Sequence, residues 1–503
     1  MYSSAGSSAG DSAFSDTASN ADSTSFGSDS LSILQPFGYS SSTCGYCAEE
    51  KGQRSKQKSS KSYGCWAHAL SCSTYKLLLD RGWRRSGAYM YKPDNARTCC
   101  VQYTISQDSS QFKPSRGQRQ VLQRFANFMR EGGRAGEKGW GPPSSTSTQA
   151  VGAEPSRDVE MNAVGAKPKD KGKGKAKNQA PVEYADMVHG GDWGRSPADH
   201  PFKNKFEYTI EPASYTDEKY ALFKRYQMEV HAEPESKVSV KGFKRFLVDT
   251  PLDLEPTSVP GISYGSHHAL YRLNGTLIAF AVLDLLPFAV SSVYFVWNPD
   301  WSGMSLGKVS ALREIQMVRE MEEKGLWEKG KGRYMMGYYI EVPKMRYKAD
   351  YQPSYLLDPA TNSYYPWEHC KPLLATSMPR AASFSNPALN PPPSSASTRD
   401  GHGNASSSLP RTTTSPDSDE SSDEDDEEES DSIFPNPAPP GCLDPARLPK
   451  TLLLNSFVLE TRTLVPLLLS TAWHDPELQQ EVRELLAATG EGCAGRLAIW
   501  TGR

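Results

Sequence analysis

Two pairs of cysteines are the residues whose type and spacing most directly suggest chemistry. Cys44 and Cys47 form a C-x-x-C pair, Cys99 and Cys100 are adjacent, and 51 residues separate the two pairs. Two thiolates three positions apart can hold one metal ion from a tight turn, and four could complete a tetrahedral zinc site or hold an iron–sulfur cluster. The wide separation predicts a site that joins distant parts of the chain, with free buried thiols as the alternative.

The remaining cysteines limit this hypothesis. Nine cysteines in a chain whose N-terminus shows no export signal favour metal or redox chemistry over disulfides. Cys65 and Cys72 are competing ligands that spacing does not exclude. Cys370, Cys442 and Cys493 are isolated along the chain, so we expect them to be inert.

Two further candidates for chemistry lie in the apolar second half of the chain. Asp284 interrupts an apolar run, where burial would raise its pKa and make it a proton acceptor unless a cation pairs with it. A paired structural aspartate is the alternative. His268 could orient a substrate, and a histidine with both nitrogens bonded in the interior is its alternative.

Basic and aromatic residues follow these candidates. The segment Lys344-Met-Arg-Tyr-Lys348 concentrates charge, and Arg suits a carboxylate because its planar guanidinium can bind both oxygens. Tyr347, Tyr351 and Tyr355 could stack on a nucleotide base, with core packing as the alternative. We predict that substrates are bound by Lys308, Arg313, Lys344, Arg346, Lys348 and Tyr351.

Strands and one long helix must position these residues. Four strand-like runs are predicted, which are His268–Leu273, Leu277–Leu283, Ser292–Trp297 and Tyr334–Ile340. Asn274-Gly275 is typical of a tight hairpin turn. Apolar residues at helical spacing predict a helix from about Ser305 to Glu323, with Gly325 as its stop. The fold class is therefore α/β, of the mixed α+β kind.

Composition divides the 503 residues into six parts. Segments dominated by Ser, Gly, Pro or charge cannot bury enough apolar surface to offset their ordering entropy, so we expect them to lack structure. The expected parts are a Ser-rich segment 1–43, a cysteine-rich module 44–130, a basic linker 131–200, a larger module 201–372, an acidic insertion 373–440, and a helical segment 441–503 that docks on the larger module.

The charge distribution is uneven although the net charge is only −3. Between Lys76 and Arg124 there are ten Lys or Arg and three Asp, a surplus of seven, interleaved with aromatic residues. This pattern is typical of a nucleic-acid surface. The predicted contacts of this module with RNA are Arg81, Arg84, Arg85 and Arg116, with a solvated surface as the alternative for each. The lysine-rich run 167–177 and the acidic run 417–431 are expected to be solvated tails.

One apolar stretch needs to be tested as a membrane span. Leu277 to Trp297 is 21 residues long, but it contains Asp284 and Pro287. An aspartate at mid-membrane costs about 2.5–3.5 kcal/mol. Two buried strands joined at Leu286-Pro287 fit better. We expect a chain that does not enter a membrane and that works in the cytoplasm, with the nucleus as a further compartment.

Several motifs in order resemble those of eukaryotic arginyl-tRNA–protein transferases, over roughly residues 44–125 and 205–370. They are Cys44-Gly-Tyr-Cys47, the run from Tyr75 to Gly87, Cys99-Cys100-Val-Gln-Tyr-Thr104, the run from Ser305 to Glu320, and the run from Pro343 to Asp358. The resemblance implies an acetyltransferase-like (GNAT-like) second module, and a first module that helps to bind tRNA and the acceptor through Arg81, Arg84, Arg85 and Arg116. It also implies transfer of arginine from Arg-tRNA to the α-amine of proteins that begin with Asp or Glu, which marks them for ubiquitin-dependent degradation.

The resemblance also bears on cofactors and partners. It implies that the four cysteines bind zinc or an iron–sulfur cluster, with haem possible, and that the transfer itself needs no cofactor. The implied partners are Arg-tRNA, acceptor proteins and a downstream ubiquitin ligase, and we expect a monomer. Two alternatives stay open: a non-catalytic cysteine-rich RNA-binding protein, and another acyltransferase on the same fold. An acyltransferase with a small thioester donor predicts a Gly-rich loop at the helix start, where only Gly307 is present.

Overall fold

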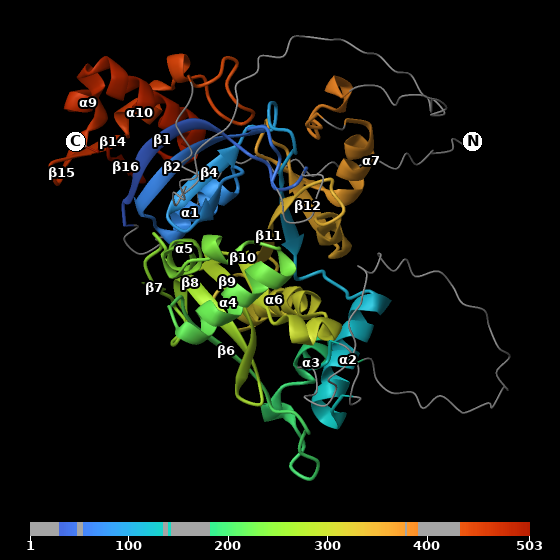
Figure 1. Cartoon of the computed structure of the whole chain (residues 1–503). Helices are drawn as coiled ribbons and strands as arrows, with labels where there is room; N and C mark the ends of the chain where they lie inside the picture. Colours follow the sequence, from blue (N-terminus) through green and yellow to red (C-terminus); the bar gives the residue numbers. More distant parts are fainter. Residues whose placement is uncertain are drawn as a thin grey trace, which may run out of the picture.

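The computed structural model describes residues 30–47, 54–133, 139–141, 182–377, 380–390 and 433–502. The lysine-rich run 167–177 and the acidic run 417–431 lie outside these residues. Among the described helices, none combines the length and the apolar character that a membrane crossing requires. The predicted mixed α/β class is confirmed, because two mixed sheets form the centre of the described chain (Figure 1).

The larger sheet carries most of the second half of the chain. Within the described residues its strand order is β13-β12-β5-β11-β10-β9-β8-β6, and β7 pairs with β8. The strands are β5 Tyr103–Asp108, β6 Phe206–Pro212, β7 Glu255–Pro256, β8 Ser263–Leu273, β9 Thr276–Leu286, β10 Ala289–Trp297, β11 Arg333–Tyr339, β12 Ser354–Leu357 and β13 Tyr364–Pro366. Neighbours are antiparallel except β10 and β11, which are parallel and joined by helix α6, Leu306–Glu323.

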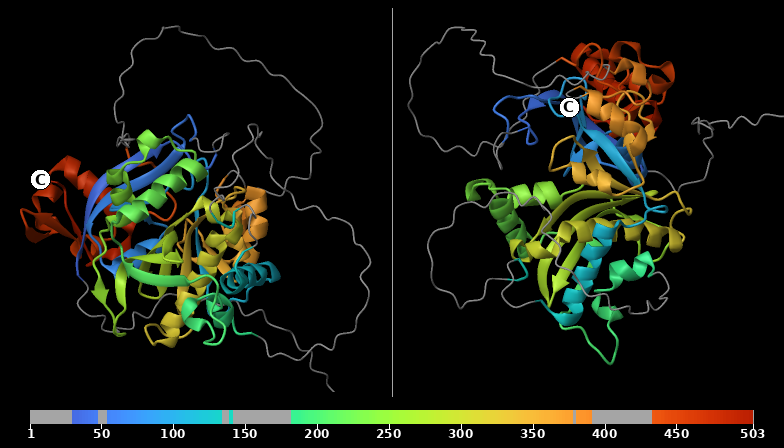
Figure 2. Two further views of the ribbon diagram at one scale, coloured as in Figure 1. Left: turned by 60° about the horizontal axis from the view of Figure 1, so that its bottom comes forward. Right: turned by 90° about the vertical axis from the view of Figure 1, so that its right-hand side faces the viewer.

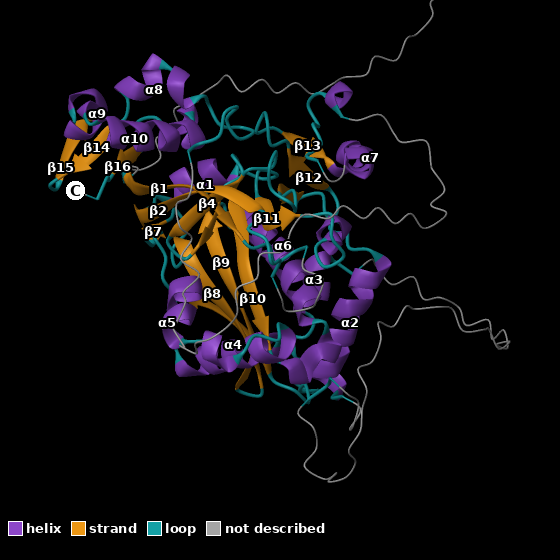
Figure 3. Cartoon of the chain, turned by 45° about the horizontal axis from the view of Figure 1, so that its top comes forward, coloured by secondary structure: helices purple, strands orange, loops and turns teal. Residues whose placement is uncertain are grey.

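Helices cover both faces of this sheet (Figure 3). Along β9, Ala281 and Leu283 belong to one core cluster, while Phe280 and Val282 belong to another. This alternation follows from the two-residue period of a strand. The first face packs against α6, α2 (Arg116–Glu131) and α3 (Tyr184–His189), and the second packs against α4 (Asp217–Val230) and α5 (Val240–Phe243).

The sequence predicted the centre of this sheet well. The four expected strands correspond to β8, β9, β10 and β11, and the expected helix corresponds to α6. Asn274 and Gly275 both have positive φ, 49° and 86°, as the tight hairpin turn requires. The break at Leu286-Pro287 separates β9 from β10. The apolar stretch is thus two buried strands.

The smaller sheet combines the two ends of the described chain, which lie side by side in Figures 1 and 2. Its order is β15-β14-β16-β1-β2-β4-β3. Its strands are β1 Ser32–Ser42, β2 Ser60–Ala69, β3 Arg84–Ser86, β4 Tyr89–Pro93, β14 Phe457–Glu460, β15 Thr463–Pro466 and β16 Leu497–Ile499. The helices α1 (Cys72–Leu79), α8 (Lys450–Leu454), α9 (Thr471–His474) and α10 (Pro476–Thr489) accompany this sheet, whereas α7 (Trp367–Ser377) follows β13.

This arrangement corrects two predictions at the ends of the chain. Residues 32–42, expected to lack structure, form β1, because β2 and β16 satisfy its backbone on both sides and Leu34 is buried. The segment 441–503 contains helices as expected, but it also contributes three strands, and these join the smaller sheet rather than the larger module. These strands have only three or four residues, which is too short to show a period in sequence.

The predicted division between modules also differs from the architecture. β5 and α2 belong to the predicted module 44–130, yet β5 lies between β12 and β11 of the larger sheet and α2 packs on α6. The helix α3 lies in the predicted linker 131–200, and its Tyr184 donates a hydrogen bond to the Leu312 carbonyl, 2.7 Å away. The first half of the chain therefore completes the core of the second.

A buried ion pair ties the two sheets together. Arg85 on β3 binds both carboxylate oxygens of Asp284 on β9, with Nη2–Oδ1 at 2.5 Å and Nε–Oδ2 at 2.9 Å. The hydroxyl of Ser266 donates to Asp284 Oδ1 at 2.7 Å. The hydroxyl of Thr250 lies 2.8 Å from the hydroxyl of Ser266. Both members of the pair are buried, so removing one leaves an uncompensated charge in the interior.

We expect Asp284→Asn to lower the free energy of unfolding by about 3–5 kcal/mol, because Arg85 then stays buried without its counter-charge. Chemical denaturation measures this change, with the exposed Asp199→Asn as the control. Replacing both members, as Arg85→Met with Asp284→Leu, should recover part of the loss. Wild-type stability of Asp284→Asn would show that the pair does not hold the sheets together.

Candidate functional site

The site begins where β10 and β11 separate. The two parallel strands pair only at Ala289–Arg333, Val290–Tyr334 and Ser291–Met335, although both continue for several more residues. We call this point of separation the fork. Beyond the fork the two strands no longer pair with each other. A point where strands part in this way is the usual position of a ligand site in a sheet with a parallel crossover.

Both strands are irregular at the fork. β10 shifts register against β9 between Ser292 and Tyr294, which leaves Val293 as a bulge. β11 shifts register against β5 between Met335 and Tyr338, and Gly337 there has a φ of 72°, a value that favours glycine. Bulges redirect side chains and release backbone groups from the ladder, and they are common beside active sites.

A buried carboxylate closes the inner end of the fork. Glu314 on α6 is 1% exposed, and it accepts hydrogen bonds from the hydroxyls of Tyr334 on β11, at 2.5 Å, and of Ser310. Ser292 on β10 also hydrogen-bonds to it. Burial raises the pKa of the Glu314 carboxyl, although these hydroxyls oppose the shift. One acidic group therefore bridges the two strands at the position where they part.

Two buried basic side chains, Arg84 and Lys348, hold β11 beyond the fork. Arg84 Nη2 donates to the Gly337 carbonyl at 3.1 Å and its guanidinium lies over the Tyr338 ring, while Lys348 Nζ donates to the Tyr338 carbonyl at 2.8 Å. Burial lowers the pKa of Lys348 to about 7. Both were predicted to contact substrate or RNA. Their contacts instead favour a structural role, because they satisfy strand carbonyls next to the opening.

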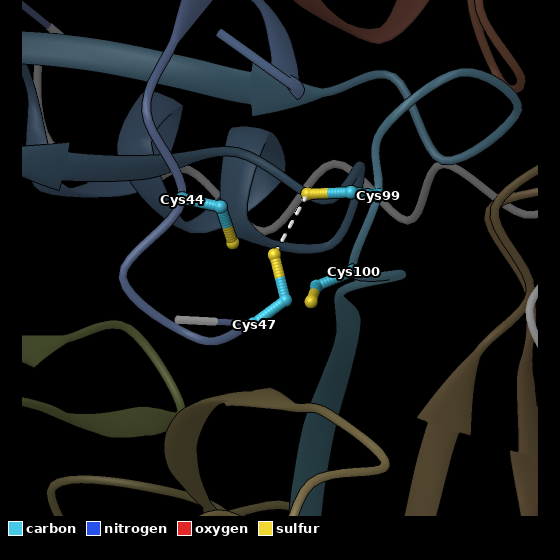
Figure 4. Close-up of side chains that lie close together, drawn as sticks. All are labelled: Cys44, Cys47, Cys99 and Cys100. Carbon is cyan, nitrogen blue, oxygen red and sulfur yellow. Dashed lines mark hydrogen bonds between the residues drawn. The ribbon is translucent and has the colours of Figure 1, made fainter. Parts of the chain in front are cut away.

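The four predicted metal ligands come together (Figure 4). The sulfurs of Cys44, Cys47, Cys99 and Cys100 lie within 4.8 Å of one another, with Cys47 and Cys99 at 3.6 Å. Zinc–sulfur bonds of about 2.3 Å in a tetrahedron place sulfurs about 3.8 Å apart, so the set fits such an ion with small adjustments. Cys65 and Cys72 lie outside this group and are buried elsewhere.

The electrostatics of the cluster also fit a cation. Burial opposes ionisation of Cys44, yet the N–H groups of Tyr46 and Cys47 and the neighbouring thiols lower its pKa. Burial and the adjacent thiols raise the pKa of Cys47 to about 11, and they raise that of Cys100 further. Four thiolates this close repel one another unless a positive ion neutralises them. The cluster could therefore bind a metal such as zinc.

The cysteine cluster lies against the outer end of β11. Cys44 and Cys100 pack in one buried cluster with Tyr338 and Ile340. Lys344 donates from Nζ to the Gly45 carbonyl at 2.6 Å. The same ammonium lies 5.1 Å from the centre of the Tyr46 ring. The loop that carries Cys44 and Cys47 and the basic segment 344–348 are therefore connected beside the fork.

The predicted catalytic residues are bonded to internal partners, although Asp284 on β9 stands opposite Ser291, the last β10 residue that pairs with β11. Asp284 is fully buried in its ion pair with Arg85, which favours the structural alternative. His268 is buried as well, with Nδ1 3.0 Å from Lys219 Nζ and Nε2 2.9 Å from the Leu247 carbonyl. Burial lowers the pKa of His268 to about 4. A neutral ring with both nitrogens bonded matches the interior alternative.

The other predicted contacts divide into buried and exposed residues. Arg313 is buried, is paired with Asp192 and lies over the rings of Phe206 and Tyr208, while Tyr351 packs against Phe112. These two are parts of the core. The exposed residues are Lys308, Lys344, Arg346 and Arg116. Arg346 forms an ion pair with Glu341. Arg81 is half-buried and donates a hydrogen bond to the Gly441 carbonyl.

Sequence reasoning missed Glu314 and Tyr46. Glu314 stands four positions after Ser310 on α6, a spacing that brings both to one face, and this was the available signal. Its burial was not visible, because a helical Glu is usually solvated. Tyr46 lies inside the recognised C-x-x-C motif, where only the cysteines attracted attention.

We expect anaerobically purified protein to carry about one metal ion or cluster per chain, because four thiols converge on one point. Cys99→Ser should reduce bound metal to below about one tenth of that amount, since a three-thiol site binds more weakly. Elemental analysis measures the ratio, and Cys442→Ser, outside the cluster, is the matched control. Equal metal content in the two variants would contradict the site.

Glu314→Gln should change how stability depends on pH. The folded protein holds the Glu314 proton more tightly than the unfolded chain, so the wild-type free energy of unfolding falls as pH rises from about 4.5 through the raised pKa. Glutamine does not titrate and lacks this contribution. Between about pH 4.5 and the raised pKa, the free energy of unfolding of the variant should therefore rise relative to that of the wild type. Denaturation at several pH values tests this, with the exposed Glu323→Gln as control. A difference that does not vary with pH would contradict the buried acid.

Comparisons with known proteins agree with this layout. Residues 42–120 match the family model described as arginine-tRNA-protein transferase, N terminus, and residues 218–358 match the model of its C terminus. Arginyl-tRNA–protein transferase 2 of Arabidopsis thaliana is 30% identical over 68% of this chain and 76% of its own length. Arginyl-tRNA–protein transferase 1 of Drosophila melanogaster is 32% identical, over 67% and 82% respectively.

A shorter similarity reaches bacterial proteins. The aspartate/glutamate leucyltransferase of Pseudomonas fluorescens strain SBW25 is 32% identical over 31% of this chain and 59% of its own. The Arabidopsis and Drosophila relatives align with about two thirds of this chain and with more than three quarters of their own lengths. The chain therefore belongs to the arginyl-tRNA–protein transferase family, whose members are aminoacyltransferases.

Proposed function

We propose that this chain transfers arginine from Arg-tRNA to the α-amino group of proteins whose first residue is Asp or Glu. The reaction joins the amine nitrogen to the arginyl carbonyl carbon and breaks the bond from that carbon to the ribose oxygen. The proton lost by the amine ends on that oxygen, and tRNA leaves with a free hydroxyl. The fork between β10 and β11 is the single observation that carries the proposal.

The geometry of the fork suits this reaction. Orientation of an amine and an ester can supply about 7–11 kcal/mol of the barrier, and a fixed donor can stabilise the oxyanion that forms on the carbonyl. The bulge at Val293 removes a backbone segment from the β9 ladder at the fork, and its N–H is our candidate donor. The catalytic contribution is then mainly one of position.

A strong base is not required. The substrate α-amine has an unperturbed pKa of about 7.7–8.0, so a sizeable fraction is neutral at physiological pH. Asp284 and His268 are both buried and bonded to internal partners. We propose that neither accepts the proton and that the departing ribose oxygen receives it directly or through solvent.

The acidic acceptor is supported by charge and by the bacterial relatives. The names of those relatives specify aspartate and glutamate, and the shared region covers about a third of this chain. At the end of β11, Lys344 and Arg346 are exposed. An exposed cation next to the opening can pair with the side-chain carboxylate of residue one. We propose Lys344 and Arg346 for this contact.

The biological consequence is a further part of the proposal. Proteins that receive arginine would be marked for ubiquitin-dependent degradation by a downstream ubiquitin ligase, with the chain acting as a monomer in the cytoplasm and nucleus. The family resemblance supports this consequence. Stabilisation of an Asp-starting reporter, but not an Ala-starting one, in cells that lack the chain would support it, and equal lifetimes would oppose it.

The direct test is transfer of labelled arginine from charged tRNA to peptides that differ only in residue one. We expect incorporation into Asp and Glu peptides at least about tenfold above that into Asn, Gln or Ala peptides, since a cation distinguishes a carboxylate from its amide. Uncharged tRNA with free labelled arginine is the blank. The same assay with Arg346→Gln should reduce the preference.

The possible failures of this assay separate the alternatives. Tight tRNA binding without transfer would favour a non-catalytic RNA-binding protein. Acylation from a small thioester, without use of charged tRNA, would favour another acyltransferase on the same fold. Equal transfer to all peptides would keep the reaction and remove the acidic specificity.

A further inference from the structure

A groove of about 710 Å³ lies between the smaller sheet and the helices on the second face of the larger sheet. One wall consists of Phe37 on β1, Trp66 on β2 and Tyr89 on β4, and the other includes Phe223 on α4 and Phe246 after α5. Its size is within the range of sites that hold a small organic ligand. None of these five residues belongs to the fork or to the cysteine cluster.

The first wall presents aromatic rings in contact with one another. Trp66 and Tyr89 have ring centres 5.1 Å apart, and Phe37 meets Tyr89 edge-on at 5.5 Å. Trp66 is 36% exposed although it stands in the middle of a sheet. The Tyr89 ring lies across Gly64, where any side chain would collide with it. The rings of Phe37, Trp66 and Tyr89 thus form an aromatic surface on this face of the smaller sheet.

The charge of the groove is positive. Arg54, Lys237 and Arg245 line it, against the single carboxylate of Glu233. Aromatic faces combined with cations are the pattern that binds single-stranded nucleic acid, because bases stack on the rings and phosphates pair with the cations. A free amino acid or a peptide amine would instead call for carboxylates on the wall.

Ring contacts connect the groove with the fork. Tyr89 stacks near Tyr91 at 6.4 Å, and Tyr91 approaches Tyr338 on β11 at 6.3 Å. On the other wall, Phe246 meets Tyr294 on β10 at 4.9 Å. Packed rings therefore link both walls of the groove to the two strands between which the ester would react, although no residue of the described strands β10 and β11 lines the groove itself.

We propose that this groove takes the single-stranded 3′ end of the donor tRNA, with bases against Trp66 and Tyr89 and phosphates near Arg54, Lys237 and Arg245. The inference rests on the proposed function, because it assumes a tRNA donor. It adds the position of the donor strand, which delivers the aminoacyl ester to the fork from the side of the smaller sheet.

The test compares intact tRNA with the same tRNA shortened by its unpaired 3′ nucleotides, using equilibrium binding. We expect Trp66→Ala to weaken intact tRNA about tenfold, the scale of one lost base stack, and to change the shortened tRNA by less than about twofold. Trp193, which is also 36% exposed but does not line the groove, supplies the matched control variant Trp193→Ala.

A second variant tests the charged part of the groove. Lys237→Gln should reduce the slope of log Kd against log salt for intact tRNA by about 0.7, the value for one contact with a single-stranded phosphate. The shortened tRNA should keep its slope. Since Lys237 is exposed, this variant does not depend on an altered core.

Three results would overturn the inference. The first is that Trp66→Ala weakens the binding of both tRNAs equally, and the second is that it weakens the binding of neither. The third is a raised KM for the peptide with unchanged tRNA binding, which would assign the groove to the acceptor. In each case wild-type protein still transfers arginine. Failure of the proposed function itself is distinct, because wild-type protein would then transfer none.

Discussion

The separation of β10 and β11 is the constraint on which the rest of the structure depends. Two parallel strands that pair over three positions and then part leave unsatisfied backbone, and the interior tolerates such backbone only with other partners. Arg84 and Lys348 supply those partners for β11. The pair of Arg85 with Asp284 fixes the smaller sheet beside the larger one. Buried basic side chains that resemble substrate contacts in sequence thus keep the opening in place.

This constraint also explains why the first part of the chain cannot be considered a separate reader of RNA. β3 supplies Arg84 and Arg85. β5 lies directly beside β11, and the loop with Cys44 packs on the end of β11. A metal on the four thiols would hold residues 44–47 to residues 99–100, and through Lys344 and Tyr46 it would stabilise one side of the opening. Removal of the metal is therefore expected to disturb the fork as well as the loop.

The sequence predicted features that depend on local pattern. The hairpin at Asn274-Gly275, the helix α6 and the convergence of four cysteines follow from turn chemistry, helical period and ligand type. It did not predict ion pairs between distant parts of the chain, because the sequence around an Arg does not show whether the fold places a buried carboxylate beside it. Arg85, Arg313 and Asp284 were assigned to substrate or catalysis for that reason, and each has an internal partner. The short strands β14 to β16 were missed because their stability comes from neighbours rather than from their own residues.

The central claim is that the arginyl ester reacts between β10 and β11. A crystal structure with an RNA end that carries arginine through a stable amide in place of the ester tests it most directly. We expect the arginyl carbonyl to lie between Tyr294 and Tyr338, within hydrogen-bond distance of the Val293 N–H. An analogue bound elsewhere, with the fork closed by its own side chains, would contradict it.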